Sequence, residues 1–282
     1  MLESILHRSR SVYLLFSLLI MSALSQAAES EYTFGVVPQQ SATQLAEVWS
    51  PLLAEVSRRS GVTLRFRTNA GIPEFEKRLA LHEYDFAYMN PLDYVIYHDV
   101  ANYQAILREK GRKLKGIVVV RKVSEFHSLE DLQGKRFAYS APGAFAATQL
   151  VQAELARRGI TVNASFVLSH ESVYRAVAAG VYAAGGGIPR TFESLPEEIR
   201  GQLRVLSTTD GYSPHALAVS RTVPDSIRSK VVSAFLSLDS DDQGRALLEP
   251  LAFKGLIPAQ DVDWNDVRAL GLTSSQPPKT SR

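Results

Sequence analysis

Cysteine is absent from all 282 residues of the chain. The fold therefore needs no disulfide bond, and the chain has no thiolate for catalysis or for binding a metal ion. A surplus of charge is also missing, because 31 Lys and Arg residues stand against 29 Asp and Glu residues and the net charge is +2. Proteins that bind nucleic acids usually carry a clear basic surplus or a basic stripe. We therefore expect no nucleic-acid partner.

The six histidines do not form an HExxH pattern or any other close spacing typical of metal ligands. The sequence also offers no nucleophile, general base and cofactor motif that would converge in one cleft. We therefore expect no metal ion, no cofactor and no enzymatic activity. An enzyme of similar fold stays an alternative to a binding function.

Long hydrophobic runs are missing except near the N-terminus. Two arginines precede the apolar run Val12–Leu24, and small residues follow it up to Ala28. This order is typical of an export signal, and the run is short for a membrane span. We expect residues 1–28 to be a cleaved signal peptide and the mature protein to be periplasmic or secreted. A retained N-terminal anchor is the alternative.

Segments typical of strands and helices alternate from Tyr32 onward, which predicts an α/β fold with mainly parallel sheets. We expect strands at 32–37, 62–67, 85–89, 103–107, 114–121, 135–139, 164–168 and 203–207, a glycine-rich strand end near 185–187, and an extended run at 213–220. We expect helices from 41 or 43 to 61, and at 72–81, 90–97, 126–134, 144–158, 171–179, 226–238, 241–249 and 261–270.

The mature chain of about 250 residues is longer than one small core usually needs, so we expect two lobes. Residues 29–121 and 214–272 are expected to form the first lobe, residues 122–213 the second, and residues 273–282 a disordered tail. Two strands would then cross between the lobes and act as a hinge around a cleft.

The segment Arg136–Thr148 carries the most informative pattern in the chain. It predicts a buried strand, a tight turn at Pro142 and Gly143, and the start of a helix without a capping side chain. Such a turn leaves free backbone N–H groups at the positive end of a helix dipole, an arrangement that suits an anion or a polar ligand. An ordinary turn between a strand and a helix is the alternative.

Ligands bind α/β lobes at the loops that follow the carboxyl ends of parallel strands. The candidate ligand-binding residues at these positions are Gln39, Gln40, Tyr88, Asn90, Tyr139, Ser140, Gly143, Ala144, Phe145, His170 and His215. Strand alternation predicts that one of Tyr88 and Met89 faces the core and the other the cleft. His215 fits either a hinge residue or a donor facing the cleft. Arg190 fits either a partner for an acidic ligand or a surface residue.

Several of these segments, taken together, resemble the periplasmic substrate-binding components of ABC transporters of the phosphate, phosphite and phosphonate type. The resemblance rests on Phe34–Pro38, Tyr84–Pro91, Leu129–Ala138, Ser169–Gly180 and the pair Pro214 and His215. It implies an α/β, two-lobed type II periplasmic-binding-protein fold, in which two βα sandwich lobes are joined by a two-strand hinge. It also implies that His170 matches a family histidine that reaches the ligand.

Two departures from the family pattern concern the ligand. Family members typically carry a Ser-Thr-Ser cluster after the proline of the turn, whereas residues 143–146 here are Gly, Ala, Phe and Ala. Each lost hydrogen bond to a charged oxygen is worth roughly 1.5–3 kcal/mol, so we expect weak phosphonate binding. An Asp that family members often carry shortly after Gly180 is also absent. Phe145 and the glycines at 185–187 favour a flatter or larger ligand.

The resemblance implies a receptor that captures a small anionic or polar ligand, phosphonate-like or phosphate-like by family, and delivers it to an ABC permease. The alternative is a periplasmic sensing module that acts on a membrane signalling partner, a histidine kinase or a diguanylate cyclase. We expect a monomer.

Overall fold

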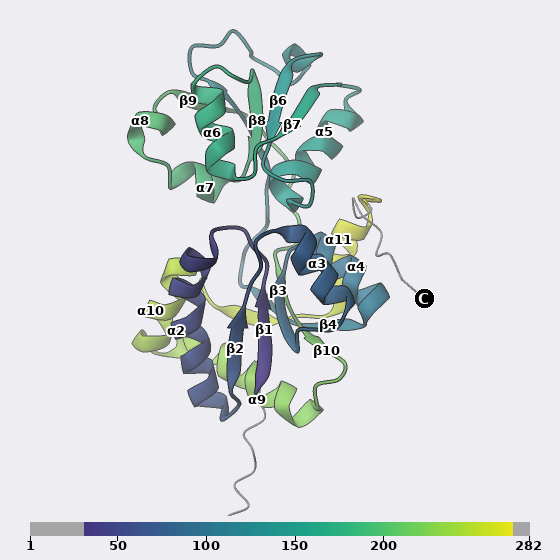
Figure 1. The fold of residues 1–282 in the computed structure, drawn as a ribbon, viewed down its shortest axis with the longest axis vertical. Helices are drawn as coiled ribbons and strands as arrows, with labels where there is room; N and C mark the ends of the chain where they lie inside the picture. Colours follow the sequence, from purple (N-terminus) through teal and green to yellow (C-terminus); the bar gives the residue numbers. More distant parts are fainter. Residues whose placement is uncertain (1–30, 273–282) are drawn as a thin grey trace, which may run out of the picture. The chain divides into compact units, whose positions relative to one another are not determined.

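The strands form two β-sheets in the computed structural model, which describes residues 31–272 (Figure 1). The six-stranded sheet has the order β11 (Leu256–Pro258), β4 (Tyr103–Glu109), β10 (Ala216–Ser220), β3 (Phe86–Met89), β1 (Tyr32–Val36), β2 (Leu64–Arg67). The five-stranded sheet has the order β7 (Asn163–Phe166), β6 (Arg136–Tyr139), β8 (Ala184–Gly187), β5 (Ile117–Arg121), β9 (Leu203–Thr208). We call the parts that carry these sheets lobe 1 and lobe 2; both belong to one compact unit that starts at Tyr32.

Helices accompany both sheets. Lobe 1 carries α2 (Ala42–Ser60), α3 (Ile72–Ala80), α4 (Pro91–Ala101), α9 (Asp225–Leu236), α10 (Asp242–Leu248) and α11 (Asn265–Arg268). Lobe 2 carries a π-helical segment, Phe145–Leu150, that continues directly into α5 (Val151–Arg157), and also α6 (His170–Ala178), α7 (Pro189–Glu193) and α8 (Glu197–Arg200). Single 3-10 turns lie at Glu130–Leu132, Leu238–Ser240, Glu249–Leu251 and Asp261–Trp264.

Local sequence signals explain where the longest helix begins and ends. Ser41 is the N-cap of α2, and its side chain and that of Gln44 form a capping box. Gly61 ends the helix in the left-handed conformation, with φ 66°, which costs glycine little. The sequence left Ser41 and Thr43 as alternative starts, and the capping geometry selects Ser41.

Both sheets are mixed, which corrects the expectation of mainly parallel sheets. β1 pairs in parallel with β2 and β3, and β6 pairs in parallel with β7 and β8. In contrast, β10 runs antiparallel to β3 and β4, and β5 runs antiparallel to β8 and β9. The physical reason is that β5 and β10 are the strands by which the chain enters each lobe from the other one. They therefore do not follow the direction of the βα units.

The chain passes between the lobes twice, at 110–116 and at 209–215. Leu114 and Tyr212 exchange two backbone hydrogen bonds of 2.8 and 2.9 Å. The N–H of Thr209 donates to the carbonyl of Gly116 at 2.9 Å. The two crossings thus support each other as a short antiparallel pair. The first crossing lies before β5, which pairs within the sheet of lobe 2, and not near residue 122.

Side chains of β5 point alternately to the two faces of the sheet and so belong to two separate cores of lobe 2. Val118 and Val120 face the core beneath α5, whereas Ile117 and Val119 face the core beneath α6. Lobe 2 is therefore a sheet covered by helices on both faces (Figure 1). This arrangement leaves the loops at the ends of its strands as the positions available to a ligand.

The glycines of β8 permit this close covering. A Cβ atom on Gly185 would lie 2.3 Å from Cγ1 of Val173 in α6, and one on Gly186 would lie 2.1 Å from the carbonyl oxygen of Ala147. Side chains at these positions would push both helices away from the sheet. The glycines at 185–187 are thus a buried strand against which helices pack. They do not line the cavity, so they give no support to the expectation of a flatter or larger ligand.

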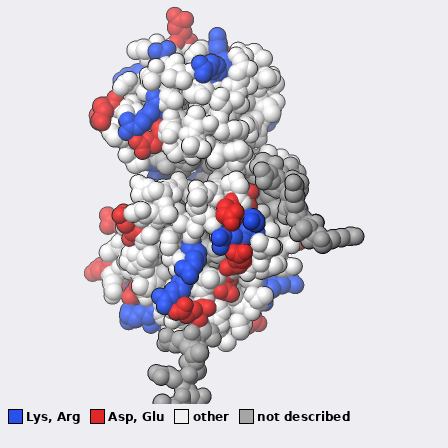
Figure 2. Space-filling view, in the orientation of Figure 1, with Lys and Arg blue, Asp and Glu red and all other residues white. Residues whose placement is uncertain are grey.

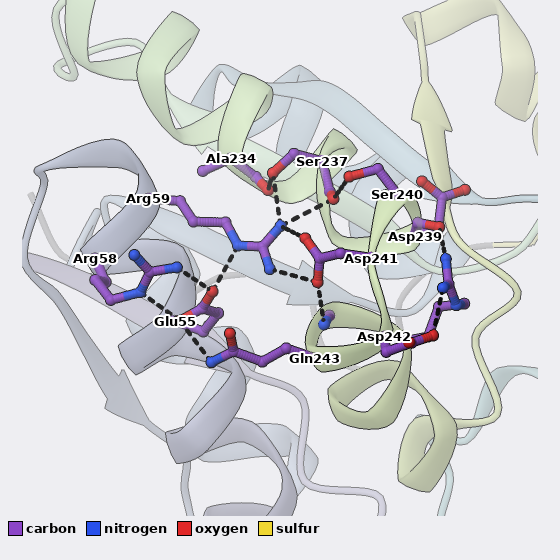
Figure 3. Close-up of polar contacts among 12 residues, drawn as sticks. Glu55, Arg58, Arg59, Ala234, Ser237, Asp239, Ser240, Asp241, Asp242 and Gln243 are labelled. Carbon is purple, nitrogen blue, oxygen red and sulfur yellow. Dashed lines mark hydrogen bonds and ion pairs between the residues drawn. The ribbon is translucent and has the colours of Figure 1, made fainter.

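A network of charged side chains joins α2 to the C-terminal helices of lobe 1 (Figure 3). Glu55 is buried and accepts hydrogen bonds from Nε of Arg58 at 2.7 Å and from Nε of Arg59 at 2.7 Å. Arg59 also donates to the carbonyl of Ser237 at 2.9 Å and to Oδ1 of Asp241 at 3.0 Å. The hydrogen bonds from Arg58 and Arg59 lower the pKa of Glu55 to about 2.

Surface charges of both signs are interspersed on the face shown in Figure 2. Within residues 31–272, no helix is both long and apolar enough to cross a bilayer. The expected signal peptide at 1–28 and the expected tail at 273–282 lie outside the described residues.

We expect the substitution Glu55→Gln to lower the melting temperature by several degrees. A neutral amide accepts weaker hydrogen bonds than a carboxylate and leaves Arg59 without one of its two ionic partners. The folded-state pKa of Glu55 lies below its usual value of 4.5. The contribution of the Glu55 carboxylate to the free energy of unfolding is therefore complete above pH 4.5, and it is lost as the pH falls toward 2. Calorimetry should show the difference between wild type and variant shrinking over that range.

Asp242→Asn is the matched control for this test. Asp242 is fully exposed, and its one partner within residues 31–272 is Arg245, at 2.6 Å, within one helical turn. Exposed pairs of this kind contribute little, so the melting temperature should stay near that of wild type. An equal loss in both variants would contradict a special role for Glu55.

Candidate functional site

A cavity of about 70 Å³ lies at the carboxyl ends of strands from both lobes. Lobe 1 contributes the loops after β1 and β3 and the start of α3, and lobe 2 contributes the loops after β6, β7 and β8. Leu114 and His215, in the two crossing segments, complete the wall. The cavity is thus bounded by both lobes and by the connections between them.

Seven of the eleven candidate residues line this cavity: Gln39, Asn90, Ser140, Ala144, Phe145, His170 and His215. The remaining four, Gln40, Tyr88, Tyr139 and Gly143, do not line it. Gln40 is exposed and lies in the loop that follows β1. A role in ligand binding stays a prediction for each of the eleven.

Tyr88 and Tyr139 belong to the cores. The hydroxyl of Tyr88 donates to Glu109 at 2.8 Å, and its ring stacks on His215 with 4.9 Å between the ring centroids. Tyr139 is fully buried against Phe137. Met89 is also fully buried, so neither member of the alternating pair lines the cavity. The expectation was wrong because β3 is a central strand whose residues are all buried.

Gly143 lies where the turn after β6 meets lobe 1. A Cβ atom at this position would lie 2.8 Å from Cγ2 of Ile72 and 3.2 Å from Oε1 of Glu76. Gly143 does not have a positive φ. It is therefore required for the close approach of the two lobes, and not for an unusual backbone conformation.

The helix that follows this turn presents unused hydrogen-bond donors. Its N-cap, Ala144, has no side chain that could cap, and its carbonyl accepts from the N–H groups of Thr148 and Gln149 at 2.9 and 3.2 Å. Within the described part of the chain, the N–H groups of Phe145, Ala146 and Ala147 have no acceptor. All three residues line the cavity. The helix dipole adds partial positive charge at the same place.

Ser140 adds a hydroxyl to these donors. It directly follows β6, is 3% exposed and lines the cavity. Its Oγ atom has no hydrogen-bond partner among the described residues. Buried hydroxyl groups in native proteins are rarely left without a partner. Ser140 and the adjacent helix start therefore place several unpaired hydrogen-bond donors in one part of the cavity wall.

His215 is fixed by lobe 1 at the edge of the cavity. Its Nε2 atom lies 2.6 Å from Nε2 of Gln39, and its ring stacks on Tyr88. An amide nitrogen can only donate, so Nε2 of the neutral ring accepts and Nδ1 carries the proton. Nδ1 has no partner among residues 31–272. His215 is therefore both close to the crossing segment and a wall residue of the cavity.

His170 opens α6 in lobe 2, directly after the N-cap Ser169. Its Nδ1 atom lies 3.3 Å from Oγ1 of Thr191. Burial, with a smaller effect of Arg190, lowers the pKa of His170 to about 4. Burial, followed by Arg190 and Arg112, lowers the pKa of His215 to about 3. Both imidazoles are therefore neutral at ordinary pH.

Formal charges surround the cavity without entering its wall. Among the described residues, those that line it include no Asp, Glu, Lys or Arg. Arg190 lies two residues after the wall residue Ile188, and its Nη1 atom donates to the carbonyl of Leu251 in lobe 1 at 2.9 Å. Arg190 thus links the lobes and influences both histidines. A role for Arg190 as the partner of an acidic ligand stays a prediction.

A pair of acidic side chains lies behind Asn90. The Nδ2 atom of Asn90 donates to Asp93 at 2.6 Å, and its Oδ1 atom accepts from the N–H of Asp93 at 2.9 Å. Burial, followed by the charge of Glu76, raises the pKa of Asp93 well above its usual value. Burial also raises the pKa of Glu76. The pair therefore resists carrying two negative charges beside the cavity.

Sequence reasoning missed most of the apolar wall. The apolar wall residues outside the candidate set are Val37, Pro38, Ile72, Leu114, Ala141, Ala146, Ala147, Leu168 and Ile188. Leu114 and Leu168 were expected in strands, and Ile72 and Ile188 appeared as ordinary helix and loop residues. The signal that could have identified them is their position directly after, or beside, the carboxyl end of a strand.

No group of three or more His, Cys, Asp or Glu side chains that could hold a metal ion occurs in residues 31–272. The chemical groups that the cavity offers are N–H donors, the hydroxyls of Ser140 and Ser169, neutral imidazoles, amides and apolar surface. This set is suited to binding and orienting a small molecule.

Comparison with known proteins gives one family and several similar folds. The family model for the periplasmic substrate-binding protein of phosphonate ABC transporters matches residues 34–264. PhnD1 from Prochlorococcus marinus, solved with methylphosphonate, is 17% identical with a TM-score of 0.77, and the match covers 86% of this chain and 97% of that one. No curated protein matches.

Two further solved structures share the fold. A binding protein component of a phosphonate ABC transporter from Pseudomonas aeruginosa is 17% identical with a TM-score of 0.76, and the match covers 86% of each chain. A Xanthomonas citri protein bound to ATP is 16% identical with a TM-score of 0.73, and the match covers 86% of this chain and 95% of that one.

We expect NMR to find both imidazoles, His170 and His215, neutral from pH 8 down to pH 5. Their pKa values of about 4 and about 3 lie below the usual 6.5. Above pH 6.5 both rings are neutral in the folded and in the unfolded protein, so they cause no loss of stability. As the pH falls from 6.5 toward 4, the unfolded state takes up protons first, and the free energy of unfolding decreases. The loss amounts to at most about 1.4 kcal/mol per pH unit for each ring.

The variant His215→Gln should show a flatter fall of melting temperature over this range. His127→Gln, at an exposed ring, should follow wild type, and a wild-type slope for His215→Gln would contradict the assignment.

We expect the substitution Gly143→Ala to separate the lobes, because the added methyl group would lie 2.8 Å from Ile72. Small-angle scattering should show a larger radius of gyration than for wild type. The double variant Gly143→Ala with Ile72→Ala should return to the wild-type value. Gly71→Ala is the control, since the nearest atom to a Cβ there is 3.7 Å away. An unchanged radius for Gly143→Ala would show that this contact does not hold the lobes together.

Proposed function

Since the chain belongs to the family of periplasmic substrate-binding proteins of phosphonate ABC transporters, we propose that it captures a small anionic or polar solute in the cavity between its lobes. The proposal includes delivery of the solute to an ABC permease. A sensing role is not favoured, because the family is a transport family.

The observation that carries this proposal is the group of unused donors at the cavity wall. The free N–H groups at Phe145–Ala147 and the unpaired hydroxyl of Ser140 point to one acceptor-rich ligand group. Buried donors of this kind are costly unless a ligand or water uses them. The neutral Nδ1–H of His215 is a further donor at the same cavity.

The position of the cavity supports capture by closure. Its wall combines loops of both lobes, so a ligand bound there contacts both and favours the state in which they are close. The contact of Gly143 with Ile72 and the hydrogen bond from Arg190 to Leu251 already join the lobes. A solute would add its own contacts to these.

The proposal also covers export and assembly. We propose that residues 1–28 are a signal peptide that is removed on export, and that the mature protein acts as a monomer in the periplasm. Intact-mass measurement of protein purified from the periplasm checks the cleavage, and light scattering checks the monomer. A full-length mass or a stable oligomer would contradict these points.

The function is tested with solutes from the natural compartment. We expect fractions of a periplasmic small-molecule extract to raise the melting temperature, because a ligand at a hundred times its Kd stabilises by about 2.7 kcal/mol. Native mass spectrometry should then identify the retained solute. A variant with Ser140→Ala and His215→Gln should lose the shift, whereas Asp242→Asn should keep it. If no fraction shifts wild type, the proposed function fails.

We expect methylphosphonate, phosphite and phosphate to raise the melting temperature only slightly at micromolar concentration. The hydroxyl cluster of the family is replaced by Ala144, Phe145 and Ala146, and no cationic side chain lines the cavity among the described residues. Backbone N–H groups, the Ser140 hydroxyl and the neutral His215 ring must then replace the hydration of a highly charged group. A large shift with micromolar methylphosphonate would show that they suffice.

A further inference from the structure

Leu168 has a backbone conformation that leucine rarely adopts. Its φ is 75°, in the left-handed region, where side chains other than Gly, Asn and Asp are strained. The turn uses this conformation to start α6, because the N–H of Ser169 donates back to the carbonyl of Val167 at 3.0 Å. Glycine would make the same turn without strain. The fold therefore needs the backbone of Leu168 and not its side chain.

The side chain of Leu168 is also almost entirely in solvent. It is 92% exposed, the highest value among the exposed large apolar residues of the described chain. It nevertheless belongs to the wall of the cavity. The N–H of Val167 donates to the carbonyl of Tyr139 at 2.9 Å, so Leu168 and Ser140 follow neighbouring strand ends at the same edge of the sheet. An exposed apolar side chain on a strained backbone position thus lies beside the donors of the site.

The rest of the wall continues this apolar surface. Phe145, Ile72 and Leu114 are all nearly buried, and each lines the cavity. The cavity offers its hydrogen-bond donors at the helix start, while these side chains and Ile188 form apolar surface. A ligand that used only the donors would leave the apolar wall in contact with water.

We propose that the ligand is an organic anion with one acceptor-rich head and an apolar body, and that Leu168 covers this body at the rim of the cavity. The proposal rests on the function proposed above and specifies its ligand class. The head binds the N–H groups of Phe145–Ala147 and the hydroxyl of Ser140. The body contacts Leu168 and the apolar wall, which makes Leu168 a residue that determines specificity.

Straight-chain anions from methyl to butyl, as sulfonates, carboxylates and phosphonates, test this proposal. The full chain is expressed, purified from the periplasm and titrated by calorimetry. In at least one series we expect the Kd to fall about fourfold with each added methylene, because burying a methylene is worth about 0.8 kcal/mol. A Kd that stays constant or rises along every series that binds would overturn the proposal. So would the absence of binding in all three series at millimolar concentration.

The variant Leu168→Gly separates the side chain from the backbone. It keeps the left-handed turn, so the melting temperature should equal or exceed that of wild type. Its Kd for the methyl homologue should match wild type, whereas its Kd for the butyl homologue should rise at least fivefold. Val123→Ala is the control, since Val123 is 85% exposed but does not line the cavity. It should leave both values unchanged.

The outcomes separate this inference from the proposed function. If Leu168→Gly binds the butyl homologue as wild type does, the specificity role of Leu168 is wrong. If the solute retained from the periplasm has no apolar group, the ligand class is wrong while solute capture stands. If no periplasmic fraction stabilises the protein, both the proposed function and the inference about the ligand class are wrong.

Discussion

The site depends on how closely the helix that starts at Phe145 approaches the sheet of lobe 2. A Cβ on Gly116 would lie 2.3 Å from the carbonyl oxygen of Ala146, and one on Gly186 would lie 2.1 Å from that of Ala147. Real Cβ atoms do not occur at such distances, so any other residue would move the helix. The free N–H groups of the first turn then would not lie in the cavity wall. Two glycines outside the turn itself therefore set the position of its donors.

Much of the architecture follows from local patterns in the sequence. The helix from Ser41 to Gly61, the strand at 32–36 and the helix start after Pro142 are where caps, apolar spacing and turn residues predict them. Such features depend on neighbours in the chain. The mixed direction of the strands was not predictable in this way, because pairing of β5 and β10 depends on how the chain crosses between lobes.

Short elements and long-range neighbours explain the remaining differences. The helices α7 and α8 and the strand β11 were not expected, and each has only three to five residues. The expected helix at 126–134 is a 3-10 turn of three residues, Glu130–Leu132, and α4 extends beyond 97 to Ala101. A strand was expected at 164–168, but β7 ends at Phe166, and the chain changes direction at Leu168, whose φ is 75°. Periodicity carries little information over such lengths.

In the candidate site, too, features set by neighbours in the chain could be predicted, and features set by long-range packing could not. Asn90, Ser140 and His170 could be placed at strand ends because the position of loops in α/β folds is general, and all three line the cavity. Tyr88 and Tyr139 do not line the cavity, because they are buried in central strands, and burial on both faces of such a strand is decided by the whole sheet. The apolar wall was missed because Ile72, Leu114 and Leu168 have no chemical pattern of their own. Their contribution appears only when loops from two lobes are brought together.

The cavity wall carries no charged side chain among the described residues. Proteins of this fold were solved with ligands as different as methylphosphonate and ATP, so shared architecture does not fix the chemistry that is bound. In this chain the unpaired donors are backbone N–H groups, the Ser140 hydroxyl and the neutral His215 ring, none of which carries a formal charge. Apolar contact must then supply a larger part of the binding free energy. The strained, exposed leucine at the rim is a place where the chain retains such contact although folding does not require it.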